Sequence, residues 1–367
     1  MAIALLALGI TGVIEVVRER RPSFLRPGAR LLAYVANAGD GTVSVVDLAG
    51  LATIATISVG PGPSGLRSLP ARKEVWGVST QGGYVWAIDA ASGSVATRIP
   101  VGDAPLAVEL SANGRRAYVT ASGANTLVAI DTASKQIVAR ARTGRRPWLA
   151  KLTPDGRTVL VPTRDDSSLE LFDAETLAPL GAIAVAQHPE QVVVLPDSTV
   201  AFVSAADADQ ISAVDLRRRA LLANLQLGGA PADMILKPDG GELYVSVPES
   251  HGIEIINTWT TEVAESMLVG LAPTNGTFAA DSGELFLSDS AAGRVLPISM
   301  DTRHQEAPIS VGRTPAMSRL DPSGEILVVA NRDSNDVAVV RVEAGTSNLL
   351  TMVPVGSRPS DVAVLLF

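Results

Sequence analysis

The sequence of 367 residues contains no cysteine and only three histidines, His188, His251 and His304. Without cysteine the chain cannot form a disulfide, a thiolate zinc site, a cysteine nucleophile or the lipid-bearing cysteine of a bacterial lipoprotein. Three scattered histidines are too few to favour a histidine metal site or a Ser-His-Asp catalytic arrangement. We therefore expect no metal site and no catalytic residues, and a protein that is a binding protein more readily than an enzyme.

Aromatic residues and positive charge are also scarce. Aromatic residues make up 4% of the chain, and the 30 lysines and arginines are outnumbered by 38 acidic residues, which gives a net charge of −8. That balance speaks against a general nucleic-acid binder. Glycine and proline are plentiful instead, at 32 and 23 residues, and this composition is typical of many short strands joined by tight turns.

Four series of residues recur every 42 positions along the chain. A polar residue lies thirteen positions after the first member of each repeat, and a glycine or alanine, followed three residues later by proline, marks each repeat's end. The period predicts four short strands per repeat, packed radially, because one four-stranded sheet cannot bury both of its faces alone. The first series consists of large apolar residues: Tyr34, Trp76, Tyr118, Leu160, Phe202, Tyr244, Phe286 and Val328.

The repeats predict an all-β, eight-bladed β-propeller made of four-stranded antiparallel blades. Residues 30–367 hold eight repeats of 42 residues and a two-residue insertion, so a seven-bladed ring would leave one repeat unplaced. The first repeat lacks its first strand, and residues 359–367 are a first strand with nothing after it. We expect these terminal strands to pair within one blade, which closes the ring and removes exposed sheet edges.

Residues 105–144 and 313–356 resemble the bacterial and archaeal YVTN (Tyr-Val-Thr-Asn) β-propeller repeat. The runs PLAVEL, AYVTA, LVAID and the later VPVG match that family's pattern of a proline-led strand, a Tyr-Val-Thr-Asn strand, a strand ending in Asp and a closing Val-Gly. The resemblance covers residues 30–367, which are nearly the whole chain. It implies the propeller fold, and it carries little information about function because one fold hosts many activities.

The amino terminus differs from the repeats. Residues 1–17 form a hydrophobic segment, shorter than the approximately 20 residues of a membrane span, and residues 18–29 form a basic linker. A membrane anchor, the tail of an anchor that begins upstream, a degenerate signal sequence and an extra strand or helix on the propeller are all compatible with it. The basic linker favours the cytoplasmic face of a membrane, whereas propellers of this type more often lie on the periplasmic face.

Alternation along the first strand of each repeat suggests which side chains line the central channel. The third and fifth residues after each proline are mostly apolar and should pack between blades, so the second and fourth should face the channel. The fourth positions include Arg67, Lys151 and Arg319, which could hold a small anionic ligand. The alternative is a water-filled channel whose charges pair with one another. The acidic residues at the second and fourth positions are Glu109, Asp233 and Asp361.

A second basic group lies in the loops that enter the first strands. These residues should gather at one mouth of the channel, where basic side chains beside an indole could take a carboxylate, a phosphate or a protein partner. The group consists of Arg145, Arg146, Trp148, His188, Arg313 and Arg358.

Three cofactor hypotheses compete with an empty channel. The loops that hold Asp165, Asp166, Asp207, Asp209, Asp333 and Asp336 are acidic, but calcium needs six to eight oxygens from one place and neighbouring blades do not obviously converge there. Glu109, Asp233 and Asn275 have the residue types of metal-dependent propeller lactonases, whose sequence pattern differs. The repeat also resembles that of haem-containing nitrite reductases and their cofactor-assembly relatives, which likewise have eight blades. That resemblance implies haem in the channel, with His188 nearest its mouth.

The expected function is a non-enzymatic propeller that serves as a rigid interaction scaffold. We expect no cofactor and no nucleic acid, and partners that are protein subunits of an envelope or membrane complex. Residues 1–17 would tether the protein, with the periplasmic face favoured and the cytoplasmic face open. The alternative is a channel that binds a cofactor or small molecule, related to haem-binding eight-bladed oxidoreductases.

Overall fold

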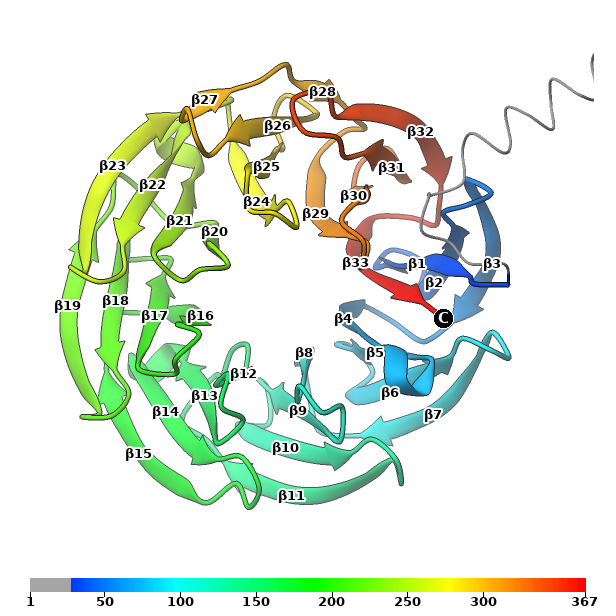
Figure 1. Cartoon of the computed structure of the whole chain (residues 1–367). Helices are drawn as coiled ribbons and strands as arrows, with labels where there is room; N and C mark the ends of the chain where they lie inside the picture. The colour runs from blue at the N-terminus through cyan, green and yellow to red at the C-terminus, as the bar shows by residue number, and fades with distance from the viewer. Residues whose placement is uncertain (1–27) are drawn as a thin grey trace, which may run out of the picture.

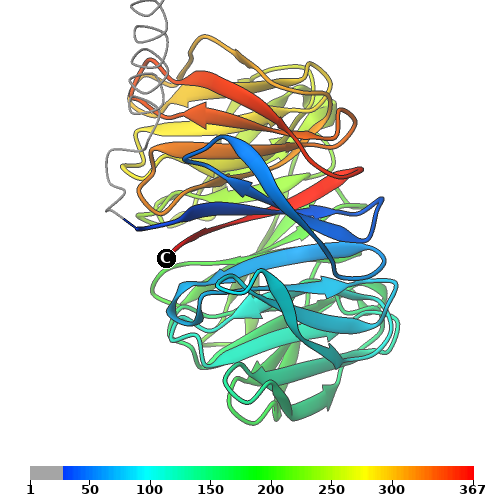
Figure 2. The same ribbon diagram turned by 90° about the vertical axis from the view of Figure 1, so that its right-hand side faces the viewer.

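The computed structural model describes residues 28–367, which form a ring of eight β-sheets (Figure 1). Turned by 90°, the ring is a disc whose blades are stacked side by side around the axis (Figure 2). The predicted eight-bladed propeller is confirmed. The predicted hydrophobic segment 1–17, and the basic linker 18–29 apart from its last two residues, lie outside the described residues.

The blades are numbered here along the chain, with the innermost strand given first. Blade 1 consists of β33 (Pro359–Leu366), β1 (Leu31–Asn37), β2 (Thr42–Asp47) and β3 (Ala52–Ser58). Blade 2 consists of β4 (Pro63–Leu69), β5 (Glu74–Ser79), β6 (Tyr84–Asp89) and β7 (Ser94–Pro100). Blade 3 consists of β8 (Pro105–Leu110), β9 (Arg116–Ala121), β10 (Thr126–Asp131) and β11 (Gln136–Arg142). Blade 4 consists of β12 (Lys151–Leu152), β13 (Thr158–Thr163), β14 (Ser168–Asp173) and β15 (Pro179–Ala184).

The second half of the ring repeats this order. Blade 5 consists of β16 (Pro189–Val194), β17 (Val200–Ala205), β18 (Gln210–Asp215) and β19 (Ala220–Gln226). Blade 6 consists of β20 (Asp233–Leu236), β21 (Glu242–Val247), β22 (Gly252–Asn257) and β23 (Glu262–Leu268). Blade 7 consists of β24 (Pro273–Phe278), β25 (Glu284–Asp289), β26 (Arg294–Ser299), β27 (His304–Gln305) and β28 (Ile309–Ser310). Blade 8 consists of β29 (Pro315–Leu320), β30 (Ile326–Asn331), β31 (Asp336–Arg341) and β32 (Asn348–Pro354). Three short 3-10 helices are η1 (Pro70–Arg72), η2 (Arg164–Asp166) and η3 (Pro248–Ser250).

Blade 7 departs from the regular pattern in its outermost strand. β27 and β28 are two short pieces that both pair with β26. The Glu306 N–H still donates to the Pro297 carbonyl at 2.8 Å, and the ladder is interrupted at residues 307–308. Two prolines explain the break, because Pro308 has no N–H to donate and Pro297 on β26 has none either. The predicted four-stranded blade is therefore interrupted at this one edge.

The ring closes through its terminal strands, as predicted. β33 pairs antiparallel with β1, from Leu31 opposite Leu366 to Asn37 opposite Pro359. The pairing extends beyond the strands, since Arg30 N donates to the Phe367 carbonyl at 2.8 Å. Figure 2, which views the disc from its side, shows the two strands next to one another. All seven residues of β1 are buried, so this junction is as well covered as the rest of the core.

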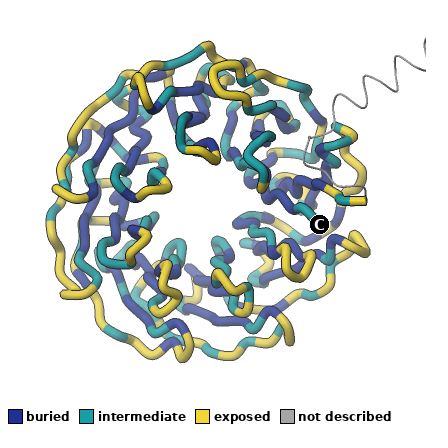
Figure 3. Tube along the Cα trace, in the orientation of Figure 1, coloured by how far each residue is buried: buried dark blue, intermediate teal, exposed yellow. Residues whose placement is uncertain are grey.

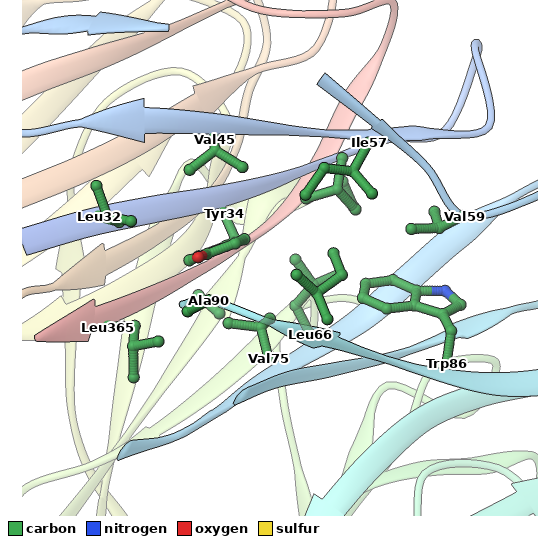
Figure 4. Close-up of a cluster of buried hydrophobic side chains, with 14 residues drawn as sticks. Leu32, Tyr34, Val45, Ile57, Val59, Leu66, Val75, Trp86, Ala90 and Leu365 are labelled. Carbon is green, nitrogen blue, oxygen red and sulfur yellow. The ribbon is translucent and has the colours of Figure 1, made fainter. Parts of the chain in front are cut away.

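The core lies between the blades rather than within one central mass. Buried apolar side chains of residues 28–367 form eight clusters, and each cluster joins two adjacent blades. Figure 4 shows the cluster between blades 1 and 2, where Trp86 lies close to Leu66. Burial is greatest in the two middle strands of a blade and lower in the innermost and outermost strands (Figure 3), as β8, β9, β10 and β11 of blade 3 show. Six of the seven residues of the outer strand β3 are exposed.

Candidate functional site

The innermost strands position the predicted channel residues, but the side chains point differently from what alternation suggested. Arg67 lies on β4, Lys151 on β12 and Arg319 on β29. Each sheet stands edge-on to the ring axis, so both of its faces meet a neighbouring blade. Alternate residues of β33 accordingly pack on opposite neighbours: Val362 joins the cluster with blade 8 and Ala363 the cluster with blade 2. The second and fourth positions therefore reach toward the next blade at the inner wall of the ring.

Three of the second-position side chains fasten one blade to the next. Asp361 Oδ2 accepts the backbone N–H of Leu66 at 2.8 Å. Asn275 Oδ1 accepts the N–H of Ser318 at 2.8 Å, and Asp233 Oδ2 accepts the N–H of Gly276 at 3.2 Å. The three bonds occupy equivalent places in the repeat. These side chains are thus committed to structural hydrogen bonds, which leaves little of a lactonase-like ligand set.

Asp233 is the most constrained of these groups. Its Oδ2 also accepts the Asn275 side-chain amide at 2.8 Å. Burial raises the pKa of the Asp233 carboxyl, while hydrogen bonds from the backbone of Gly276 and Met234 act in the opposite direction. Desolvation is the largest of these effects because a buried carboxylate loses its hydration.

Lys151 is neutralised within the wall of the ring. Its Nζ lies 3.0 Å from Glu109 Oε1, and Glu109 comes from the equivalent fourth position of the preceding blade. The Glu109 carboxylate also accepts the N–H of Leu152 at 3.4 Å. For this residue the alternative of paired charges describes the geometry.

Arg67 and Arg319 have a different environment. Each donates one hydrogen bond to the backbone carbonyl of its own preceding residue, at 2.8 Å to Leu66 and 2.9 Å to Ser318. The ion pairs found within residues 28–367 include neither guanidinium. The two cations lie on blades 2 and 8, on either side of blade 1, so they flank Asp361.

Arg319 is largely desolvated. Burial lowers the pKa of Arg319, the charge of Arg67 lowers it further, and the charges of Asp361 and Asp233 oppose this. Both carboxyl oxygens of Asp361 already accept backbone N–H groups, from Leu66 and Val362 at 2.8 Å each. The nearest acidic groups therefore compensate the arginine charges only in part, and they bind neither guanidinium directly.

At the mouth, the predicted basic group meets the acidic loops that follow the second strands. Arg145 Nε lies 2.7 Å from Asp166 Oδ1, and Arg146 Nη1 lies 3.3 Å from Asp165 Oδ1. Hydrogen bonds from the backbone and side chain of Arg145 hold the pKa of Asp166 below its usual range. The two groups that the sequence suggested separately are thus one paired network.

The network continues through Arg164, which the sequence reasoning missed. Its guanidinium contacts Glu190 and lies 3.4 Å from Asp207 Oδ2, and it stacks over the Trp148 ring at 5.3 Å. Asp207 Oδ2 also lies 2.7 Å from His188 Nδ1. Arg164 directly precedes Asp165 and Asp166, and this position could have revealed it. Only the acidic residues of that loop were considered as candidates from the sequence.

Arg313 and Arg358 are the most open members of the basic group. Arg313 Nη2 donates to the carbonyl of Asp333 at 2.8 Å, and its side chain is exposed. Arg358 is exposed and has a positive φ of 53°, and its backbone N–H donates to Asn335 Oδ1 at 2.9 Å. The structure therefore places the six predicted mouth residues on one face, most of them tied to acidic loops. Their role in binding stays a prediction.

No group of three histidine, aspartate or glutamate side chains within residues 28–367 could hold a metal ion. No helix in the same range has the length and apolar character needed to cross a bilayer.

The fold is similar to that of two solved structures. The chain resembles the solved structure titled dihydro-heme d1 dehydrogenase NirN in complex with DHE, with a TM-score of 0.78, 18% identity, and coverage of 93% of this chain and 76% of that chain. Hydrazine synthase of Kuenenia stuttgartiensis aligns with a TM-score of 0.64 and 20% identity over 77% of this chain and 96% of that chain. At these identities the likeness shows the fold alone. A search of curated protein sequences gave no significant match.

A match to a protein-family sequence model identifies the family of this chain. The sequence model of the YNCE-like beta-propeller family matches residues 82–284, which is more than half of the chain. A β-propeller repeat family was expected from the 42-residue period, and this match supports it, while the narrower YVTN assignment stays a prediction. The chain belongs to the YNCE-like beta-propeller family.

Proposed function

We propose that this propeller is a non-enzymatic binding protein that holds a small carboxylate-bearing molecule at its axis, against Arg319 and Arg67. The observation that carries the proposal is the pair of guanidinium groups on the inner wall, each hydrogen-bonded only to its own backbone and neither in an ion pair of the described residues.

The physical argument is one of incomplete compensation. Partly desolvated cations that repel each other raise the free energy of the protein without ligand, and an anion that contacts both would lower it. Arginine suits this task because its planar guanidinium can bind a carboxylate through two parallel hydrogen bonds. Lys151 lacks this property here because Glu109 already neutralises it at 3.0 Å.

Tetrapyrroles are the first ligand class to test, because they carry carboxylate groups. The solved structure of NirN is titled as a complex with DHE, which supports the choice as an analogy of fold. The residues at the axis fit the carboxylates of such a ligand. For a haem iron, only His188 among the three histidines precedes an innermost strand, and its Nδ1 is 2.7 Å from Asp207.

Arg319→Gln is expected to weaken binding of an anionic probe by about tenfold or more, equivalent to about 1.4 kcal/mol or more. The probes are haem, followed by its absorption spectrum, and citrate, followed by calorimetry. Lys151→Gln is the matched control, since this cation is already paired, and it should leave affinity unchanged. Equal affinity in the Arg319 variant, or no binding of either probe, would overturn the proposal.

The scaffold function is a second candidate, favoured by an apolar edge on the mouth face. Leu268 is 85% exposed and Leu271 is 59% exposed, and the two flank the loop that leads from blade 6 to blade 7. His251 Nδ1 fixes this loop through the Leu271 carbonyl at 2.5 Å. Exposed leucines held on an ordered loop suit a protein partner. That partner would be a subunit of a membrane complex, with residues 1–17 as the tether and the periplasmic face favoured.

Fractionation of cells that express the full chain tests the scaffold proposal. We expect the protein in the membrane fraction, together with stoichiometric partner subunits that detergent does not remove. Leu271→Asp should release those partners while leaving the membrane association intact, because the tether lies elsewhere in the chain. A soluble and solitary protein would count against the scaffold function without bearing on the binding of anions at the axis.

A further inference from the structure

Blades 2 and 6 share a contact that joins each of them to the next blade on the face opposite the mouth. Glu74, at the start of β5, binds Lys135 of blade 3. Glu242, at the start of β21, binds Arg303 of blade 7 in the same way. The partners are separated by 61 residues in both cases. The contact is therefore a property of the repeat and not of one pair.

An aromatic side chain completes each of these contacts. Trp76 Nε1 donates to Glu74 Oε2 at 2.9 Å, and Lys135 Nζ lies 5.5 Å from the Trp76 ring centroid. In blade 6, Tyr244 donates to Glu242 Oε2 at 2.7 Å. Each carboxylate thus receives a cation on one oxygen and a donor from the ring on the other, and the ring also faces the cation, with Arg303 5.4 Å from the Tyr244 ring centroid.

Blade 7 keeps the glutamate and loses both partners. The equivalent residues are Glu284, Phe286 and Gly345. Phenylalanine has no polar hydrogen to donate, and glycine has no side chain. Glu284 Oε1 accepts the N–H of Gly345 at 2.8 Å, whereas Oε2 has no partner among the described residues.

The resulting carboxylate is buried and uncompensated. Glu284 is only 6% exposed, and burial raises its pKa, with the nearby carboxyl groups of Glu306 and Asp281 acting in the same direction. A side-chain hydrogen bond with Glu306 also raises the pKa of Glu284, and that bond requires a proton on one of the two carboxyl groups. When both groups are ionised they only accept hydrogen bonds, so Oε2 then has no donor. A group with its own cation in two blades is left without one in the third.

A cavity of about 440 Å³ lies at this position between blades 7 and 8. Its size is within the range of small-molecule sites. Its walls include Glu284 and Gly345, and three further carboxylates come from the surrounding turns: Asp281, Asp301 and Glu306. No three acidic or histidine side chains of residues 28–367 are grouped as metal ligands, so the cavity suits an organic cation better than a metal ion.

We propose that this cavity binds a small organic cation, an alkylammonium or a guanidinium, whose charged group takes the place that Lys135 and Arg303 occupy in the equivalent contacts. The cation would supply the hydrogen-bond donor that Glu284 Oε2 lacks. The site is distinct from Arg67 and Arg319, since neither arginine lines the cavity and the charged side chains that do are carboxylates.

Calorimetry on the full chain with agmatine tests the proposal, with 1-butanol as a neutral probe and Ca²⁺ as a metal probe. We expect saturable binding of agmatine, none of 1-butanol, and at least tenfold weaker agmatine binding in Glu284→Gln. No binding of agmatine, equal binding by the variant, or binding of Ca²⁺ alone would overturn the proposal.

Gly345→Lys provides an independent test because it restores the cation of the other blades. The backbone allows it: Gly345 has a φ of +70°, close to the 58° of Lys135 and the 55° of Arg303, and an added Cβ would meet no atom within 4 Å. We expect this variant to lose agmatine binding and to melt at a higher temperature. Gly345→Asn tolerates the same backbone without adding charge and should still bind. Agmatine binding that survives in the lysine variant would overturn the proposal.

Discussion

Replacing Trp86 with alanine is expected to lower the free energy of unfolding by about 3–5 kcal/mol. Trp86 is fully buried and joins β6 to the cluster that unites blades 1 and 2 (Figure 4). Neighbouring Gly77 makes room for the indole, since a Cβ at Gly77 would lie 2.4 Å from Trp86 Cζ2. The alanine variant would leave a cavity beside the junction that closes the ring. Urea denaturation followed by circular dichroism measures the loss.

Trp86→Phe separates packing from hydrogen bonding. Trp86 Nε1 is buried and has no hydrogen-bond partner within the described chain, so removing it deletes an unsatisfied donor, and this variant should cost much less than alanine. Trp76→Phe is the matched control, because Trp76 Nε1 donates to Glu74 Oε2 at 2.9 Å. Removing the indole N–H leaves this buried carboxylate oxygen without its hydrogen-bond donor. An equal loss of stability in the two phenylalanine variants would contradict this reading.

Asp361→Ala is expected to destabilise the protein by about 2–4 kcal/mol, because two backbone N–H groups lose their acceptor. The carboxylate is 6% exposed and binds the N–H groups of Leu66 and Val362. It therefore joins the C-terminal strand β33 to blade 2 at the place where the ring closes. The measurement is the urea midpoint of each variant at pH 7.

Asp361→Asn should retain part of the stability that the alanine variant loses, because its single amide oxygen can still accept the Leu66 N–H although not the Val362 N–H as well. The repeat supplies the reason: Asn275, at the equivalent position of blade 7, makes the same bond to Ser318 N at 2.8 Å with an amide oxygen. If the asparagine variant is as unstable as the alanine variant, the charge rather than the acceptor oxygen is what blade 1 requires.

The sequence carried the fold because its information is local and repeated eight times. Period-two alternation defines each strand, and the first strand missing from repeat one is found at residues 359–367. The pairing of Leu31 with Leu366 was predictable on these grounds. The interrupted edge of blade 7 was less visible, since it requires knowing that Pro297 and Pro308 fall on the same stretch of ladder.

The sequence predicted which residues occupy the candidate site and where they lie in the repeat, but it did not predict which groups they contact. Arg67, Lys151 and Arg319 are equivalent in the repeat, and nothing in their local sequence distinguishes them. In the folded chain Lys151 pairs with Glu109 at 3.0 Å, whereas Arg319 is desolvated and flanked by a carboxylate that backbone groups already occupy. The direction of these side chains was misjudged because a blade stands edge-on to the axis, so alternation separates the two neighbouring blades rather than the channel from the core.

By itself the sequence determined the number of blades, the strands within them and the strand that closes the ring, since each follows from hydrophobic alternation at a fixed period. Only the tertiary structure decided which charges are compensated. The partners of Glu74, Glu242 and Glu284 lie 61 residues away. That Gly345 stands where the other two blades have a cation can therefore be recognised only from the packed blades. Charge pairing depends on distance and burial in space, and the ring sets both.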